Sequence, residues 1–172
     1  MSELRNRMRD EVNRIALIDT HEHLMSEQAR LKRKIDLFYW FCHYASSDVI
    51  SAGFPEANRE WLLDTDVGLD ERWESFAPFW EHARTTGYGR ALLLAARDLF
   101  DIQDISSSTY RELSEKLSAS NRAGWYEYVL KERANIDVSV LKSLEDWDPI
   151  PLADVDRRFF APVVCMNDFI MP

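Results

Sequence analysis

The sequence predicts an α/β fold whose strands form a parallel sheet, and three observations lead to this prediction. An apolar run at residues 15–18 has the composition of a buried strand. Two further strand-like segments occupy residues 135–141 and 159–165. Helical periodicity dominates the long stretch between the first and second of these segments, about residues 27–133. The expected order is therefore strand, long helical insertion, strand, connector, strand.

The first strand is expected over about residues 15–23. Its start, Ile15-Ala16-Leu17-Ile18, is uniformly apolar and rich in branched side chains, with polar residues on both sides. Such a run without alternation is typical of a strand in a parallel sheet that helices cover on both faces. The charged segment before it, about residues 2–13, is predicted to be a short helix.

Within residues 27–133 the apolar side chains recur at helical spacing. The clearest stripe has the spacing i, i+3, i+4, i+7 and consists of Trp73, Phe76, Ala77 and Trp80. Asp70 precedes this stripe as the predicted N-cap. Thr109 and Glu112 have the spacing of a capping box and predict the start of another helix. Similar patterns predict helices around residues 91–100 and 125–131.

The second strand is predicted from alternation and the third from a short apolar run. Ile136, Val138 and Val140 alternate with polar residues, which is the pattern of a strand with one covered face. The third strand is expected at residues 159–165, after a connector rich in Pro and Asp at residues 144–158.

Composition and charge exclude several classes of function. The 172 residues are 46% hydrophobic and carry a net charge of −9, with a pI near 4.9. Such an acidic chain is a poor partner for nucleic acid or for an anionic membrane. The charged N-terminus lacks the apolar core of a signal peptide, and no apolar run is long enough to span a membrane. We therefore expect a cytoplasmic protein, in which Cys42 and Cys165 serve as small buried side chains.

The first strand leads directly into Asp19-Thr20-His21-Glu22-His23, which holds two of the four histidines of the chain. Side chains two residues apart on a strand project from the same face, so His21 and His23 are expected to point to one place. Two neutral imidazoles held by a stiff backbone are good ligands for a divalent transition metal. Their place after the apolar run is the carboxyl end of the strand, where α/β folds hold their functional residues. The alternative is a pair of purely structural histidines.

This segment resembles the D-x-H-x-H motif on the first strand of the amidohydrolase superfamily, whose members are metal-dependent enzymes. Later segments resemble, in order, the insertion between strands one and two of uronate isomerases and their amidohydrolase-2 relatives. These segments are His43-Tyr44, Ser51-Ala52-Gly53, the Trp-rich helix ending at His82, and residues 97–102, 113–117 and 135–137. The resemblance covers residues 15 to about 170. It implies a partial (β/α)8 TIM barrel, with residues 1–172 as the N-terminal part of one barrel domain.

The resemblance also implies roles for individual residues. His21 and His23 would be ligands of a divalent metal, with zinc expected, and His43 and Tyr44 would reach towards the substrate. Arg84, in the turn 84–90, could bind a carboxylate group in bidentate fashion. Two alternatives stay open: His43 as an ordinary histidine in an aromatic segment, and the turn as a simple link between helices.

The sequence departs from the family where further metal ligands and a general base are expected. After the third strand only Asp168 is a candidate, and three strands do not close a barrel that takes about 250 residues. We therefore expect an incomplete N-terminal segment that needs the missing C-terminal half or forms a homo-oligomer.

The function implied is that of a metal-dependent hydrolase, in which activated water attacks a C–N or C–O carbonyl carbon. The general base would lie outside the chain, so the chain alone is expected to be inactive. The alternatives are a uronate isomerase-like aldose–ketose isomerase or decarboxylase, with a carboxylate or sugar acid as substrate, and a non-catalytic fragment that acts by association. Lys142 and its neighbours lack the acidic run expected after strand two of a strict uronate isomerase.

Overall fold

The computed structural model describes residues 3–142 and 154–163, and the chain divides into two compact units. The first unit, here the sheet unit, combines Met1–Lys32 with Arg122–Pro172. The second, the helical unit, is Arg33–Asn121. Cys165 and Asp168, and part of the predicted third strand, lie outside the described residues.

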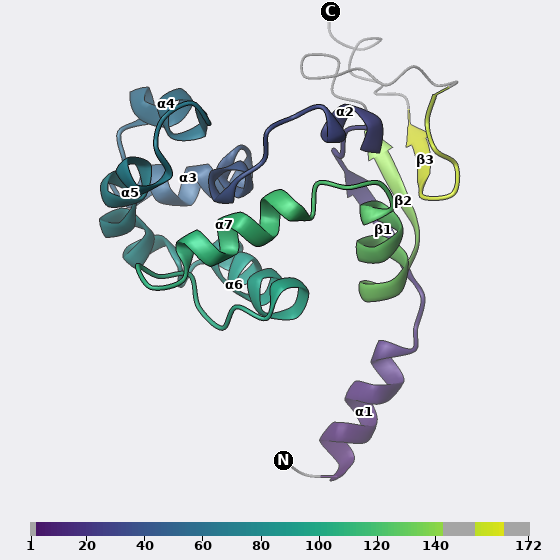
Figure 1. The fold of residues 1–172 in the computed structure, drawn as a ribbon. Helices are drawn as coiled ribbons and strands as arrows, with labels where there is room; N and C mark the ends of the chain where they lie inside the picture. Colours follow the sequence, from purple (N-terminus) through teal and green to yellow (C-terminus); the bar gives the residue numbers. More distant parts are fainter. Residues whose placement is uncertain (1–2, 143–153, 164–172) are drawn as a thin grey trace, which may run out of the picture. The chain divides into compact units, whose positions relative to one another are not determined.

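The sheet unit contains a parallel sheet of three strands in the order β1-β2-β3 (Figure 1). Its elements are α1 (Glu3–Asn13), β1 (Leu17–Glu22), α2 (Glu27–Leu31), the π-helical segment η3 (Glu127–Arg133), β2 (Ile136–Lys142) and β3 (Phe160–Val163). Leu17 is in register with Ile136, and Ser139 with Phe160.

The predicted partial TIM barrel is wrong. Most described elements are helices, and the only sheet among the described residues is this small three-stranded one. The strand patterns predicted parallel pairing, which is observed. Parallel pairing is common to many α/β folds, however, and does not by itself specify a barrel.

One face of the sheet packs against η3. Tyr126, Leu130, Leu141, Val155, Phe159 and Phe160 form the buried core of this unit. The burial of β2 is the reverse of the predicted pattern: Ser139 and Leu141 are fully buried, whereas Ile136, Val138 and Val140 are only partly buried. Gly124, just before the helical turn, has φ +80°, a conformation in which a side chain would be strained.

The expectation that the first strand is covered on both faces is also wrong. Leu17 is 50% exposed and Ile18, on the opposite face, is 64% exposed. β1 pairs only with β2 among the described strands and is therefore an edge strand. The apolar composition correctly predicted a strand but not its burial, because burial depends on what packs against it.

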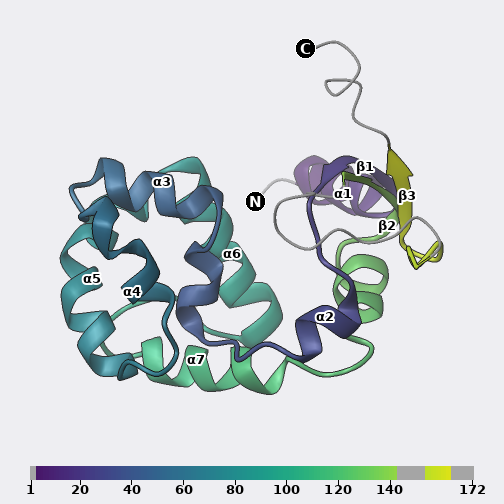
Figure 2. The same ribbon diagram turned by 90° about the horizontal axis from the view of Figure 1, so that it is seen from above.

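The helical unit consists of short and medium-length helices (Figures 1 and 2), and its buried core is rich in aromatic side chains. Its elements are η1 (Leu37–Phe41), α3 (Tyr44–Ser51), η2 (Glu56–Asn58), α4 (Arg59–Leu63), α5 (Leu69–Ala83), α6 (Gly87–Phe100) and α7 (Tyr110–Ala119). Figure 2 shows α3, α5, α6 and α7 forming a ring, and Figure 1 shows α4 at the top of this unit.

The core confirms the predicted apolar stripe of α5. Trp73, Phe76 and Trp80 are buried, and Phe76 meets Phe38 and Phe41 edge-on at ring-centroid distances of 5.3 and 4.7 Å. The indole Nε1 of Trp80 donates a hydrogen bond to a backbone carbonyl at 2.9 Å, so its polar atom is satisfied inside the core.

Two predicted helix starts differ in detail. The N-cap of α5 is Gly68 rather than Asp70, which lies in the first turn and accepts hydrogen bonds from α7. Thr109 is the N-cap of α7, as predicted, but its side chain makes no capping hydrogen bond. The Thr109 hydroxyl instead donates to the carbonyl of Asp104 at 2.7 Å, which fixes the preceding loop. Within residues 3–142 and 154–163, no helix combines the length and apolar character that a membrane span requires.

Candidate metal site on strand β1

The two histidines of the candidate site lie at the carboxyl end of β1. His21 is in the strand, and His23 follows its last residue, Glu22. Their backbone is held locally: the Asp19 carboxylate accepts from the His21 N–H at 3.2 Å, and Glu22 accepts from the His23 N–H at 2.8 Å. These contacts fix the backbone that carries both imidazoles.

The pairing of β1 with β2 is irregular at this point. Asp19 is in register with Ser139, and Glu22 with Leu141. The chain therefore advances three residues along β1 where it advances two along β2. An extra residue of this kind is a β-bulge, which changes the direction of nearby side chains. The bulge therefore lies directly beside the histidines.

The structure brings the two imidazole rings together. Their centroids are 4.5 Å apart and the ring planes meet at 86°. His21 is exposed and His23 half-buried, so the pair is open to solvent on one side. This geometry fits part of the ligand set of a divalent transition metal, because imidazole nitrogens from two nearby rings can approach one ion.

Two carboxylates flank the rings. Burial raises the pKa of the Glu22 carboxyl above its ordinary value, and repulsion from Asp19 acts in the same direction, while the hydrogen bond from His23 opposes them. Glu22 is the residue that the sequence argument missed, and its position between the two histidines was the signal available.

A complete metal site is not formed by the part of the chain that the structure describes. No group of three or more His, Cys, Asp or Glu side chains within it is arranged to hold an ion. Structural and catalytic zinc sites use three or four protein ligands. The two imidazoles thus account for at most half of a tetrahedral set, and Asp168, named from the sequence, lies outside the described residues.

The other predicted site residues belong to the helical unit. His43 is the N-cap of α3, and its ring contacts the Tyr44 ring at a centroid distance of 4.0 Å. Tyr44 is half exposed and stacks on Tyr88 at 5.5 Å with nearly parallel planes. His43, Tyr44 and Tyr88 therefore form a surface aromatic group at the starts of α3 and α6.

Arg84 ends α5 and already has acidic partners. Its guanidinium pairs with Asp104 and, at 3.3 Å, with Glu81. A carboxylate ligand would have to compete with both. Only residues 84–86 of the predicted turn link α5 to α6, and Gly89 lies in the first turn of α6, where a Cβ would lie 2.3 Å from the carbonyl oxygen of Ala83, so only glycine fits there. These observations favour the reading of this turn as a link between helices.

No protein-family model matches the chain, and no curated protein matches it. The resemblance to the amidohydrolase superfamily therefore stays a prediction from the motifs.

Proposed function

We propose that the chain binds a divalent transition metal, with zinc expected, through His21 and His23, and that it belongs to a metal-dependent hydrolase. The observation that carries the proposal is the pair of adjacent rings at the carboxyl end of a parallel strand. The resemblance of the D-x-H-x-H motif to amidohydrolases adds the reaction class. A bound divalent ion would supply Lewis acidity, which activates water and polarises a carbonyl group.

The chain's own residues would position the ion rather than complete the chemistry. The hydrogen bonds that Asp19 and Glu22 accept from the backbone N–H groups of His21 and His23 orient the histidine segment. The described residues supply two imidazoles, so we expect weak metal binding and no efficient turnover without further ligands. A cytoplasmic location and a carboxylate or sugar-acid substrate remain part of this proposal, with isomerisation and decarboxylation as alternative reactions.

Metal binding tests the proposal directly. We expect equilibrium dialysis with Zn²⁺ to give about one bound ion per chain, and His21→Ala or His23→Ala to weaken binding about tenfold or more. His82→Ala is the matched control, because His82 is an exposed histidine on α5. Unchanged zinc stoichiometry and affinity in His21→Ala, or an equal loss in His82→Ala, would contradict the proposal.

A second candidate function is association without catalysis, and the exposed apolar surface of the sheet unit favours it. None of the residues of α1 is buried, and β1 is an edge strand with apolar side chains exposed on both faces. Exposed apolar patches with an unpaired strand edge are typical of interaction surfaces. The homo-oligomer expected from the sequence would use this surface.

A further inference from the structure

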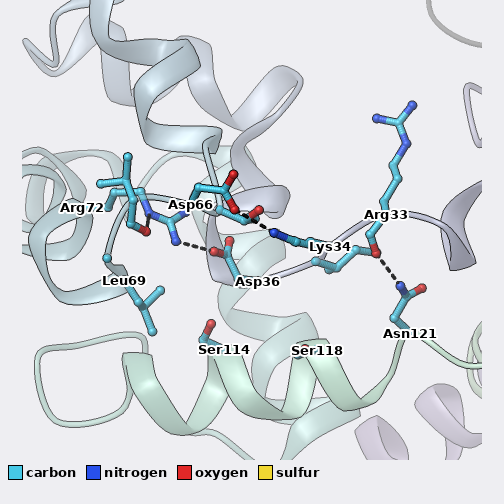
Figure 3. Close-up of a pocket in the computed structure, with 13 residues that line it drawn as sticks. Arg33, Lys34, Asp36, Asp66, Leu69, Arg72, Ser114, Ser118 and Asn121 are labelled. Atoms are coloured by element: carbon cyan, nitrogen blue, oxygen red, sulfur yellow. Dashed lines mark hydrogen bonds and ion pairs between the residues drawn. The ribbon is translucent and has the colours of Figure 1, made fainter.

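The helical unit contains a cavity of about 540 Å³, a volume typical of small-molecule sites. Figure 3 shows its lining, which comes from three segments of this unit: the extended stretch 33–36, the loop 65–69 with the start of α5, and one side of α7. This cavity is independent of the histidine pair, and none of the residues predicted to form the functional site lines it.

One wall consists of small polar side chains on α7 and just beyond it. Ser114 and Ser118 follow the spacing i, i+4 and therefore share one side of the helix, and Asn121 lies two residues after its last residue. Ser114 Oγ accepts from the Leu37 N–H at 3.2 Å, and Asn121 Nδ2 donates to the Arg33 carbonyl at 2.9 Å. These bonds tie the stretch that carries Lys34 to α7, so two walls of the cavity are held together.

The buried ion pair between Arg72 and Asp36 forms the inner end of the cavity. Arg72 is 2% exposed and donates to Asp36 at 2.6 Å and to the carbonyls of Leu62 and Val67, both at 3.1 Å. Breaking a buried, hydrogen-bonded pair of this kind is costly. This pair therefore shapes the cavity and stays intact when a ligand enters.

The mouth carries a second ion pair of a different kind. Lys34 Nζ lies 2.7 Å from Asp66, and the two side chains are 74% and 79% exposed. An exposed ion pair contributes little free energy, so water or a ligand can separate Lys34 from Asp66 at a small energetic cost. The hydrogen bond between them raises the pKa of Lys34 and lowers that of Asp66, so both groups are charged at neutral pH.

Two of the three cations that line the cavity have an anionic partner there: Lys34 pairs with Asp66, and Arg72 pairs with Asp36. Arg33 also lines the cavity, but Figure 3 shows its guanidinium directed away from Ser118 and Asn121. A lone anion would meet Asp66 and Asp36, and a lone cation would meet Lys34 and Arg72. A ligand that carries both signs on neighbouring atoms can satisfy Lys34 and Asp66 together.

We propose that this cavity binds a free α-amino acid with a polar, uncharged side chain. The α-carboxylate accepts from Lys34, and the α-ammonium group, which is bonded to the same carbon, donates to Asp66. The opening of one weak ion pair is thus compensated by two new charge-assisted hydrogen bonds. The ligand side chain then extends along α7 towards Ser114 and Ser118, whose hydroxyl groups donate to or accept from an amide.

Calorimetric titration of the full chain with L-glutamine tests the proposal. Two analogues separate the contacts: glutaminamide lacks the carboxylate, and N-acetylglutamine lacks the ammonium group. We expect L-glutamine to bind about fivefold or more tightly than either analogue, which is the effect of losing one charge-assisted hydrogen bond. Absence of glutamine binding, or equally tight binding of inorganic phosphate or of either analogue, overturns the proposal.

Two substitutions assign each contact to its residue. Lys34→Met removes the advantage of glutamine over glutaminamide, and Asp66→Asn removes its advantage over N-acetylglutamine. Both side chains are exposed, so the variants should fold, which far-UV circular dichroism verifies. Asp98→Asn is the matched control, because Asp98 forms an exposed ion pair with Arg97 at 2.7 Å on α6 and does not line the cavity. Unchanged ligand preference in both cavity variants, or the same change in the control, overturns the proposal.

Discussion

At the scale of single residues, Ser139 is a buried polar group that has no hydrogen-bond partner among the residues that the structure describes. It lies in the central strand β2, is fully buried, and its hydroxyl group makes no hydrogen bond within residues 3–142 and 154–163. A hydroxyl buried in this way costs about 1–3 kcal/mol relative to an apolar group. A serine here therefore lowers the stability of the sheet unit.

We expect Ser139→Ala to raise the free energy of unfolding by about 1 kcal/mol, because it removes the unsatisfied hydroxyl. Urea denaturation followed by far-UV circular dichroism measures the change. Ser114→Ala is the control. Ser114 is also buried, but its hydroxyl oxygen accepts a hydrogen bond from the Leu37 N–H, so this substitution should lower the free energy of unfolding by about 1 kcal/mol. Equal destabilisation in both variants would contradict the assignment of Ser139.

At the scale of elements, the starts of α5 and α7 are joined by one acidic side chain. Asp70, in the first turn of α5, accepts from the Tyr110 hydroxyl at 2.7 Å and from Arg111 Nε at 2.9 Å. Hydrogen bonding from Arg111, and next from Tyr110, holds the pKa of Asp70 below its ordinary value. Because this pKa is lowered on folding, its contribution to stability is present above the unfolded pKa of about 4 and is lost as the pH falls through the folded pKa.

Tyr110→Phe should therefore reduce stability in a pH-dependent way. At pH 7 we expect the free energy of unfolding to fall by about 1–2 kcal/mol, because the substitution removes the hydroxyl group that donates a hydrogen bond to the charged Asp70 carboxylate. Below the folded pKa of Asp70 the difference from wild type should narrow, because the acceptor is then neutral. Urea unfolding at a series of pH values measures both effects, with the half-exposed Tyr88 as a Phe control. A loss that does not depend on pH would show that Asp70 is not the relevant partner.

The same helices show how far the sequence predicts the fold. The stripe of Trp73, Phe76 and Trp80 was predicted because helical periodicity is a local pattern, and the structure confirms it. The role of Asp70 was predicted wrongly because its partners, Tyr110 and Arg111, lie forty and forty-one residues further along the chain. A residue that satisfies a capping pattern can be used by a tertiary contact instead.

The candidate sites differ in the same way. His21 and His23 are two residues apart, so their proximity follows from local backbone geometry and could be proposed from the sequence. Lys34 and Asp66 are thirty-two residues apart in loops without a motif, and only the fold brings them together. The covering of β1 was predicted wrongly, because an apolar strand does not specify what packs against it.

At the scale of the whole molecule, the helical unit has the character of an inserted domain. It begins at Arg33 and ends at Asn121, and the Asn121 side chain donates to the Arg33 carbonyl at 2.9 Å. Domains whose two ends lie close together can be inserted into another domain without disturbing it. The part of the segment between β1 and β2 that runs from Arg33 to Asn121 is therefore a compact unit with its own aromatic core.

The sheet unit, in contrast, leaves its N-terminal elements uncovered, and this leads to a prediction about association. Four apolar side chains at the spacing i, i+4, i+8, i+11 form one stripe along and just beyond α1, and each is about 60% exposed: Leu4, Met8, Val12 and Ile15. An isolated helix of 11 residues is marginally stable in water. Burial of the stripe against a second copy would stabilise α1 and cover the edge strand β1.

We expect sedimentation velocity to show self-association that increases with protein concentration. Met8→Lys, in the middle of the stripe, should shift the equilibrium towards monomer by about tenfold or more, because a charge would be buried in an apolar contact. Leu94→Lys is the matched control, since Leu94 is an exposed leucine on α6 that lies outside the stripe. A monomer at all concentrations, or association that Met8→Lys and Leu94→Lys weaken equally, would show that the stripe does not mediate self-association.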